Sequence, residues 1–213
     1  CLLSRGLGDV YKRQVHKSAA RLLELINTIL EFRKTETQNR RLKVTYADLA
    51  TVVREAGARY RSLNTVAALD IHTEIEPGDY TLWHDPEIVA MIVDNLMSNA
   101  CKYTPAGTVT LMLRHTSESG VPFTEISVAD TGLGMDAETL SHIFDRYYRD
   151  SNTANRLGTG IGLALVYNLV TLHQGEIFVE SHPGRGSVFR FRIHTENTYP
   201  EAARKEPGTD RAQ

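Results

Sequence analysis

Hydrophobic residues recur every three or four positions from Val15 to about Thr35, a spacing that predicts an amphipathic helix with one apolar stripe. A stripe sustained over about five turns is typical of a coiled coil or a helical bundle. The wholly polar stretch 36–41 ends this helix. We therefore expect the helix to require a partner helix.

The rest of the chain alternates between helix and strand patterns. Helices are predicted over 47–62, 85–102, 137–144 and 161–173, and strands over 42–46, 70–75, 109–115, 124–129, 176–181 and 187–194. Thr45 or Asp48 is the expected N-cap of the first of these helices, and Pro86 begins the second. The elements predict an α+β fold, an α/β sandwich in which helices cover one face of a mixed, mostly antiparallel sheet.

Both ends of the chain differ from this central part. Residues 1–14 show no helical or strand period and resemble translated sequencing-adapter read-through, so we expect a sequencing or assembly artefact; a loop of a truncated protein is the alternative. From residue 195 the chain is rich in Glu, Lys, Pro, Gly and Thr, which predicts a linker or disordered tail over 195–213. The main predicted domain therefore spans 42–194.

Composition narrows the class of protein. Of 213 residues, 41% are hydrophobic and 23% charged, which is typical of a globular protein and excludes collagen, coiled-coil rods and wholesale disorder. The formal net charge of −2 offers no basic field for nucleic acid or anionic lipid. Cys1 and Cys101 are too few for a disulfide framework or a thiolate zinc site, and we expect Cys101 to be a packing residue. The scattered histidines show no metal-ligand spacing.

The first candidate functional cluster lies on the predicted helix 85–102. Asn95, Asn99 and Lys102 are spaced i, i+4 and i+7 and share one helix face, opposite an apolar face. Two amides and an ammonium can bind a magnesium ion and phosphate oxygens, because Mg²⁺ prefers oxygen ligands that it shares with substrate phosphates. Taken alone, the cluster is equally compatible with a solvated helix face.

Two glycine-rich segments form the other clusters. Asp130 directly follows a predicted strand and can accept a hydrogen bond from an exocyclic amine, while Gly132 and Gly134 allow the backbone to approach a ring. A tight turn with an aspartate cap is the alternative. The segment 158–163 opens a helix, where backbone N–H groups can hold phosphates. Neither segment has the βαβ context of a dinucleotide-binding fold.

In this order and spacing, the clusters resemble the ATP-binding catalytic domain of sensor histidine kinases, and the resemblance covers residues 15–194. The matching boxes are Asn95-Leu-Met-Ser-Asn99-Ala-Cys-Lys102-Tyr103-Thr104 (N box), Asp130-Thr-Gly132-Leu-Gly134-Met (G1 box), Ile143-Phe144-Asp-Arg146-Tyr147-Tyr148-Arg149 (F box) and Gly158-Thr-Gly160-Ile-Gly162-Leu (G2 box). The segments 173–175 and 180–189 resemble the closing strands of that family. Tyr147 stands where the family often has Phe.

The resemblance implies a histidine-kinase-like ATPase fold with ATP and Mg²⁺ as cofactors. Asn99 would bind magnesium with the support of Asn95, Lys102 would contact phosphate, Tyr103 would lie against the nucleotide, and Asp130 would bind the adenine amine. Further nucleotide-binding residues would be Gly132, Gly134, Phe144, Arg146, Gly158, Thr159, Gly160, Ile161, Gly162 and Leu163. The residues between Phe144 and Gly160 would form a mobile ATP lid.

The expected reaction is transfer of the γ-phosphoryl group to a histidine. The wider gyrase-like superfamily places a glutamate base four residues before the magnesium Asn, where this chain has Asn95. An amide cannot take a proton from water, so transfer is favoured over hydrolysis. An ATP-binding regulatory or phosphatase-type module, a hydrolytic ATPase and a pure interaction protein remain open as alternatives.

The helix over 15–38 resembles the second helix of that family's dimerisation hairpin. No His-Glu/Asp-x-x-Thr/Asn-Pro acceptor pattern occurs in the sequence, and His16 lacks the acidic neighbour and the proline. We therefore expect a fragment that lacks the acceptor histidine and cannot phosphorylate itself. The resemblance further implies a homodimer through the hairpin and a response-regulator receiver domain as partner, which in a hybrid sensor would lie on the same chain. It also implies that this chain is the cytoplasmic portion of a membrane-anchored bacterial sensor.

Overall fold

The computed structural model describes residues 15, 18–19, 22–23, 25–35, 41–148, 160–197 and 199. Alternating apolar positions build a five-stranded sheet in the order β2-β4-β5-β7-β6. Its strands are β2 (Leu69–Ile75), β4 (Gly107–Glu118), β5 (Val121–Asp130), β6 (Glu176–His182) and β7 (Gly186–His194). β2 and β4 run parallel, whereas the other neighbouring pairs are antiparallel. The predicted mixed, mostly antiparallel sheet is confirmed.

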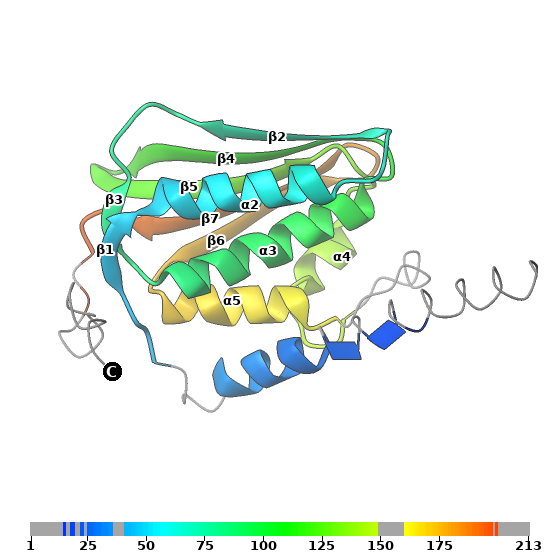
Figure 1. The fold of residues 1–213 in the computed structure, drawn as a ribbon, viewed down its shortest axis with the longest axis horizontal. Coiled ribbons are helices and arrows are strands. Elements are labelled where there is room, and N and C mark those ends of the chain that lie inside the picture. Colours follow the sequence, from blue (N-terminus) through cyan, green and yellow to red (C-terminus); the bar gives the residue numbers. More distant parts are fainter. Residues whose placement is uncertain are drawn as a thin grey trace, which may run out of the picture.

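Three helices cover one face of this sheet: α2 (Leu49–Leu63), α3 (Pro86–Tyr103) and α5 (Gly162–Leu172), while the short α4 (Ala137–His142) lies beyond its edge (Figure 1). The core forms between the two layers, where Ile92 and Leu96 of α3 are buried with Leu111, Ile126 and Phe191 of the sheet. The described helices include none long and apolar enough to cross a membrane. The predicted α+β sandwich is therefore confirmed.

A two-stranded ribbon adds an element that the sequence pattern did not predict. β3 (Thr81–His84) pairs antiparallel with β1 (Thr45–Asp48), and Asp48 lies opposite Thr81. Because β1 continues to Asp48, α2 begins two residues later than predicted. Asp48 Oδ1 accepts a hydrogen bond of 2.9 Å from Ala50 N, so Asp48 is the N-cap and the alternative, Thr45, belongs to the strand.

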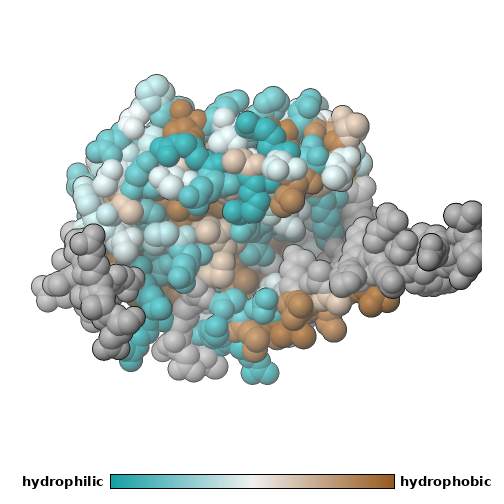
Figure 2. Space-filling model, in the orientation of Figure 1, coloured by the Kyte–Doolittle hydropathy of each residue, from teal (hydrophilic) through white to brown (hydrophobic). Residues whose placement is uncertain are grey.

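The N-terminal helix is confirmed where it is described, at residues 25–35 and at several earlier positions. Phe32 is 5% exposed and packs on the core, and Asn168 of α5 donates to Thr35 Oγ1 at 3.4 Å. Most of the apolar stripe instead faces outward, at Val15, Leu22, Leu23, Ile26, Ile29 and Leu30. Figure 2 shows these hydrophobic residues along the lower edge of the molecule. The partner helix expected for this stripe stays a prediction.

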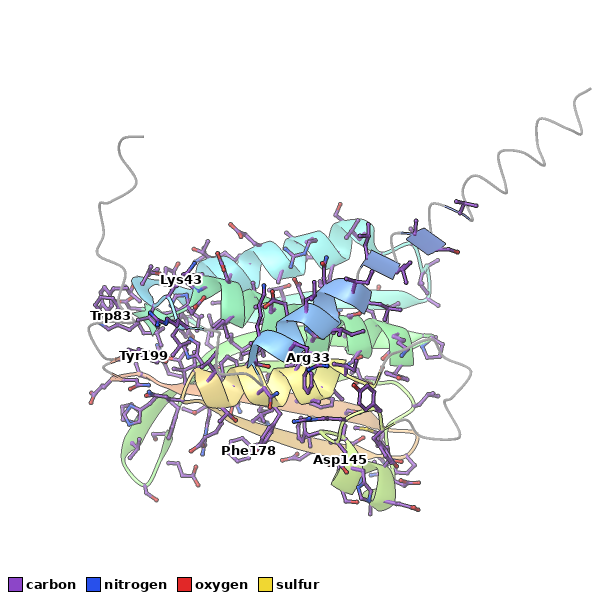
Figure 3. The ribbon with its side chains drawn as sticks, turned by 90° about the horizontal axis from the view of Figure 1, so that it is seen from below. Arg33, Lys43, Trp83, Asp145, Phe178 and Tyr199 are labelled. Atoms are coloured by element: carbon purple, nitrogen blue, oxygen red, sulfur yellow. The ribbon has the colours of Figure 1, made fainter. Side chains whose placement is uncertain are left out.

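The chain after β7 packs on the domain, which corrects the prediction of a linker or disordered tail from residue 195. Thr195 N donates to Pro122 O at 3.1 Å, and Asn197 Nδ2 donates to Gln174 Oε1 at 3.1 Å. Tyr199 is fully buried. It lies at the same end of the fold as Lys43, where the chain enters β1 (Figure 3). Apolar periodicity could not reveal this, because one aromatic side chain anchors the segment. The predicted artefact 1–14 and the remaining tail 200–213 lie outside the described residues.

Asp85 joins the start of α3 to the chain that enters the domain. Its Oδ1 accepts hydrogen bonds from Glu87 N and Ile88 N, each at 3.1 Å, and its Oδ2 accepts one from Lys43 N at 2.8 Å. We expect Asp85→Ala to lower the free energy of unfolding by about 2 kcal/mol, because the helix cap and the bond to Lys43 are lost together.

Urea denaturation measures this change. The matched control is Asp70→Ala on β2, whose exposed side chain should contribute less than about 0.5 kcal/mol. Equal effects of the two substitutions would show that the Asp85 cap does not stabilise α3.

Candidate nucleotide-binding site

The polar face of α3 carries the first predicted cluster. Asp85 and Pro86 begin the helix, and its apolar face, which includes Ile88 and Leu96, is buried against the sheet. This packing fixes the rotation of the helix, so that Asn95, Asn99 and Lys102 lie on a partly exposed side. The predicted sharing of one helix face by these residues follows from the helix geometry.

Asn95 lies where α3 meets the start of α5. Its Nδ2 donates to Met91 O at 2.8 Å. A Cβ atom at Gly162 would lie 3.0 Å from Asn95 Oδ1, so the two helices approach closely at this point. The structure therefore places one member of the N box beside one member of the G2 box, which are far apart in the sequence.

Lys102 and Tyr103 form a pair at the end of α3. Lys102 Nζ donates to the Tyr103 hydroxyl at 2.9 Å and lies 4.5 Å from the centre of its ring, within cation–π distance. The neighbouring Cys101 packs on the core, and burial raises the pKa of its thiol. Because a thiol with a raised pKa is a poor nucleophile, this environment agrees with the prediction that Cys101 is a packing residue.

Asp130 is the last residue of β5 and is 8% exposed. Its Oδ1 accepts hydrogen bonds from Gly132 N at 2.8 Å and from Thr104 Oγ1 at 3.3 Å. Burial raises the pKa of the Asp130 carboxyl, while bonds from Gly132, Thr104 and Ser187 partly offset that rise. The result is a buried hydrogen-bond acceptor held rigidly at a strand end, as recognition of a base edge requires.

The loop after Asp130 is held between α3 and the β6–β7 turn. Leu133 N donates to Tyr103 O, at the end of α3, at 3.2 Å. Gly134 has φ +63°, and a Cβ there would lie 1.9 Å from His182 O. A side chain at this position would therefore be strained and would collide with the turn, which explains why the G1 segment needs glycine here.

The F-box residues lie beside α5 and the N-terminal helix. The Phe144 ring is 5.6 Å from that of Tyr167, and the Arg146 guanidinium lies 5.1 Å from the Phe32 ring. Tyr147 N, near the start of the predicted lid, donates to Gly160 O at 2.9 Å, so the two ends of the lid lie close together. The rest of the lid, residues 149–159 with Gly158 and Thr159, lies outside the described residues.

The start of α5 differs from that of the other labelled helices. α2, α3 and α4 each have an aspartate N-cap, whereas α5 has the buried, apolar Ile161 at that position and no acidic residue in its first turn. A carboxylate would repel phosphate, so this helix start is the one suited to an anion. Gly160 precedes it with φ +68°, and Leu163 is partly buried against the core.

Sequence reasoning did not assign Thr104 and Ser187 to the site, although both bind Asp130. Ser187 lies directly opposite Asp130 in the β5–β7 register, and Thr104 is the C-cap of α3. Local patterns carry no signal for these contacts, because only strand register and helix placement bring the three residues together. The local indication in the sequence was that a hydroxyl residue, Thr104, follows Lys102-Tyr103 in the motif.

The sequence of this domain matches a known protein family. Residues 84–197, just over half of the chain, match the family model described as "Histidine kinase-, DNA gyrase B-, and HSP90-like ATPase". The chain belongs to this ATPase family. The match begins at the end of β3 and covers every described segment of the candidate site except the contact with Phe32.

Curated relatives of this ATPase domain are histidine kinases. Histidine protein kinase DivJ of Caulobacter vibrioides is 33% identical over 184 residues, which cover 86% of this chain and 30% of that protein. Sensor histidine kinase RcsC of Salmonella typhimurium is 32% identical over 84% of this chain and 19% of that protein. Adaptive-response sensory kinase SasA of Rippkaea orientalis is 32% identical over 84% of this chain and 46% of that protein. The chain thus spans less than half the length of each of these histidine kinases, to which its sequence is similar over most of its own length.

Solved structures agree with this assignment of the ATPase domain. Full-length ShkA in complex with AMPPNP is 26% identical, with a TM-score of 0.72 over 83% of this chain and 36% of that chain. Histidine kinase AdeS of Acinetobacter baumannii, at 20% identity, has a TM-score of 0.67 over 84% of this chain and 81% of that chain. The second likeness is one of fold alone.

Proposed function

We propose that this domain binds Mg-ATP and transfers the γ-phosphoryl group to a histidine, for relay to a response regulator. The observation that carries the proposal is the position of the polar face of α3. At one point Asn95 meets the start of α5, and at the end of the helix Tyr103 and Thr104 contact the G1 segment at Leu133 and Asp130. One continuous site therefore offers phosphate-binding groups and a base-binding carboxylate.

The base would bind at the Asp130 end. The buried Asp130 carboxylate accepts hydrogen bonds and would accept one from the exocyclic amine of adenine, while Tyr103 would lie against the nucleotide. Gly132 and Gly134 let the loop lie close to the end of α3 and to the β6–β7 turn, because a Cβ at either position would collide with those segments. A purine with a carbonyl in place of that amine would face the carboxylate with an acceptor, so the pocket would favour adenine.

The phosphates would bind along the polar face of α3 that carries Asn99 and Lys102, beside the start of α5, where Asn95 approaches Gly162. The described residues include no group of three or more His, Cys, Asp or Glu side chains that could hold a metal. The amide oxygen of Asn99 fits a magnesium ion that takes its other ligands from phosphates and water. When bound, that ion would neutralise phosphate charge during transfer.

Asn95 supports transfer rather than hydrolysis. Its amide nitrogen donates to Met91 O one turn earlier in α3, and its oxygen faces Gly162 at the start of α5. An amide has no basic lone pair with which to activate water. The γ-phosphoryl group would therefore await an imidazole nucleophile from outside the domain.

The activities of the whole protein follow as further parts of this proposal. The outward-facing apolar stripe of the N-terminal helix supports a homodimer through a helical hairpin, because two such stripes would cover each other. A receiver domain would accept the phosphoryl group from the hairpin histidine. The domain would work on the cytoplasmic side of a membrane-anchored sensor.

The test mixes the full chain with γ-labelled ATP, magnesium and a separate acceptor hairpin from a full-length relative. We expect acid-labile label on the hairpin histidine and none on this chain, whose His16 lacks the acceptor pattern. Asn99→Ala should reduce the labelling rate by at least about tenfold, because magnesium loses a ligand. Ser98→Ala, at an exposed neighbouring position on α3, is the matched control.

Three results would contradict the proposal. ATP binding without transfer would indicate a regulatory or phosphatase-type module. Steady phosphate release without an acceptor would indicate a hydrolytic ATPase. Label on this chain alone would show that it carries its own acceptor histidine.

A further inference from the structure

A row of three polar residues crosses the sheet behind the G1 segment. Asp130 on β5 lies opposite Ser187 on β7, and Ser187 lies opposite Ser181 on β6. All three are buried, with exposed fractions of 8%, 7% and 8%. Because buried hydroxyl groups need hydrogen-bond partners, the two serines are expected to form hydrogen bonds with neighbouring segments of the site.

Ser181 is the point at which three segments meet. Its Oγ accepts a hydrogen bond of 2.8 Å from Met135 N, at the end of the G1 segment. The same oxygen lies 3.0 Å from Ser187 Oγ and 3.0 Å from Gly186 O. A single hydroxyl thus connects the G1 segment, the β6–β7 turn and the serine that contacts Asp130.

The direction of these bonds follows from the number of protons. Gly186 O can only accept, so the single proton of the Ser181 hydroxyl is donated to it. The Ser181 oxygen is then left as an acceptor for the Ser187 hydroxyl and for Met135 N–H. Ser181 therefore joins the G1 segment and β7 to the β6–β7 turn.

The surrounding backbone leaves little room for adjustment. Gly186 has φ +85°, and a Cβ there would lie 1.8 Å from Asp130 O. Gly184 N donates to Leu133 O at 2.7 Å. Because the turn and the G1 segment are in backbone contact, a shift of the turn would move the loop that faces the nucleotide.

We propose that Ser181 is a positioning residue for the nucleotide site, whose hydroxyl holds the G1 segment at Met135 against the β6–β7 turn at Gly186. The inference rests on the proposed function, since it concerns the affinity of the same site for ATP. Ser181 would not touch the nucleotide itself. Its loss would loosen the loop, because Met135 N–H and the Ser187 hydroxyl would lose their acceptor and Gly186 O its donor.

The experiment measures the ATP dissociation constant by calorimetry with magnesium at about pH 7.5 for the full chain and its variants. We expect Ser181→Ala to raise the dissociation constant about tenfold, because the hydrogen bonds that hold the G1 segment to the turn are lost.

Two further variants of Ser181 separate the effect of its hydroxyl group from the effect of its side-chain volume. Ser181→Thr retains the hydroxyl and should bind ATP within about twofold of the unchanged protein, whereas Ser181→Cys retains the volume and should behave like Ser181→Ala. Ser127→Ala is the matched control, since Ser127 is equally buried at 8% but lies on the opposite face of β5.

Unchanged affinity in Ser181→Ala, or in Ser181→Cys should the alanine variant fail to fold, would overturn the inference. Equal losses in Ser181→Thr and Ser181→Cys would do the same, because they would show that packing rather than the hydroxyl matters. If the unchanged protein binds no ATP, the proposed function fails instead.

Discussion

Asp130→Asn is expected to weaken ATP binding by about 100-fold or more. Three groups donate to the buried carboxylate: Gly132 N–H, the Thr104 hydroxyl and Ser187. An amide offers one acceptor oxygen in place of two and turns an N–H₂ group toward one of these donors. The charge that would bind the adenine amine is also lost, and such a bond contributes about 1.5–3 kcal/mol.

Calorimetric titration with Mg-ATP measures this change, with Asp70→Asn on the exposed side of β2 as the matched control. The variant should remain folded, since a neutral amide is easier to bury than a carboxylate. ATP binding that is unchanged by Asp130→Asn would remove the base-binding role from Asp130 and would favour a pure interaction protein.

Acid is expected to destabilise the domain through the buried His173. This residue is fully buried, and Tyr199 is buried beside it. His173 Nε2 accepts a hydrogen bond of 3.0 Å from Asp85 N, which leaves the ring proton on Nδ1. Nδ1–H can then donate to the Tyr199 oxygen at 2.7 Å, while the Tyr199 hydroxyl donates to His173 O at 2.8 Å. Every polar atom of the pair is satisfied only when the imidazole is neutral.

The sign of the effect follows from this geometry. Burial lowers the pKa of His173 from 6.5 to about 4, so the unfolded chain binds a proton between these values and the folded chain does not. Stability from His173 is complete above pH 6.5 and is lost as the pH falls toward 4. The pKa of the buried His84 is lowered in the same direction, whereas the raised pKa of Asp130 opposes the loss.

From pH 7.5 to pH 5.0, His173 alone should lower the free energy of unfolding by about 2 kcal/mol. Urea denaturation at both pH values measures the change. His173→Gln should be less stable at pH 7.5, because Asp85 N–H loses its acceptor or the Tyr199 oxygen loses the donor at Nδ1, and its stability should fall less with pH. An equal fall in the variant would show that other groups cause the acid sensitivity.

Helix α3 shows what could be predicted locally. Its cap, its apolar face and its polar face all follow from positions within 18 consecutive residues, because helix geometry depends on local spacing. The strand β3 was missed because four residues carry a pattern too short to identify, and it forms through pairing with β1. The burial of Tyr199 was missed because its partner His173 lies 26 residues away.

From the sequence alone came the class of fold, the order of its helices and strands apart from β3, and the identity of the boxes that resemble an ATP site. These features depend on local periodicity and on motif spacing, which the chain carries directly. Only the tertiary structure decided that Asn95 faces Gly162, that Ser187 and Thr104 hold Asp130, and that Ser181 ties the G1 segment to the β6–β7 turn. Such contacts join distant segments, and they depend on strand register and helix packing, which no local pattern specifies.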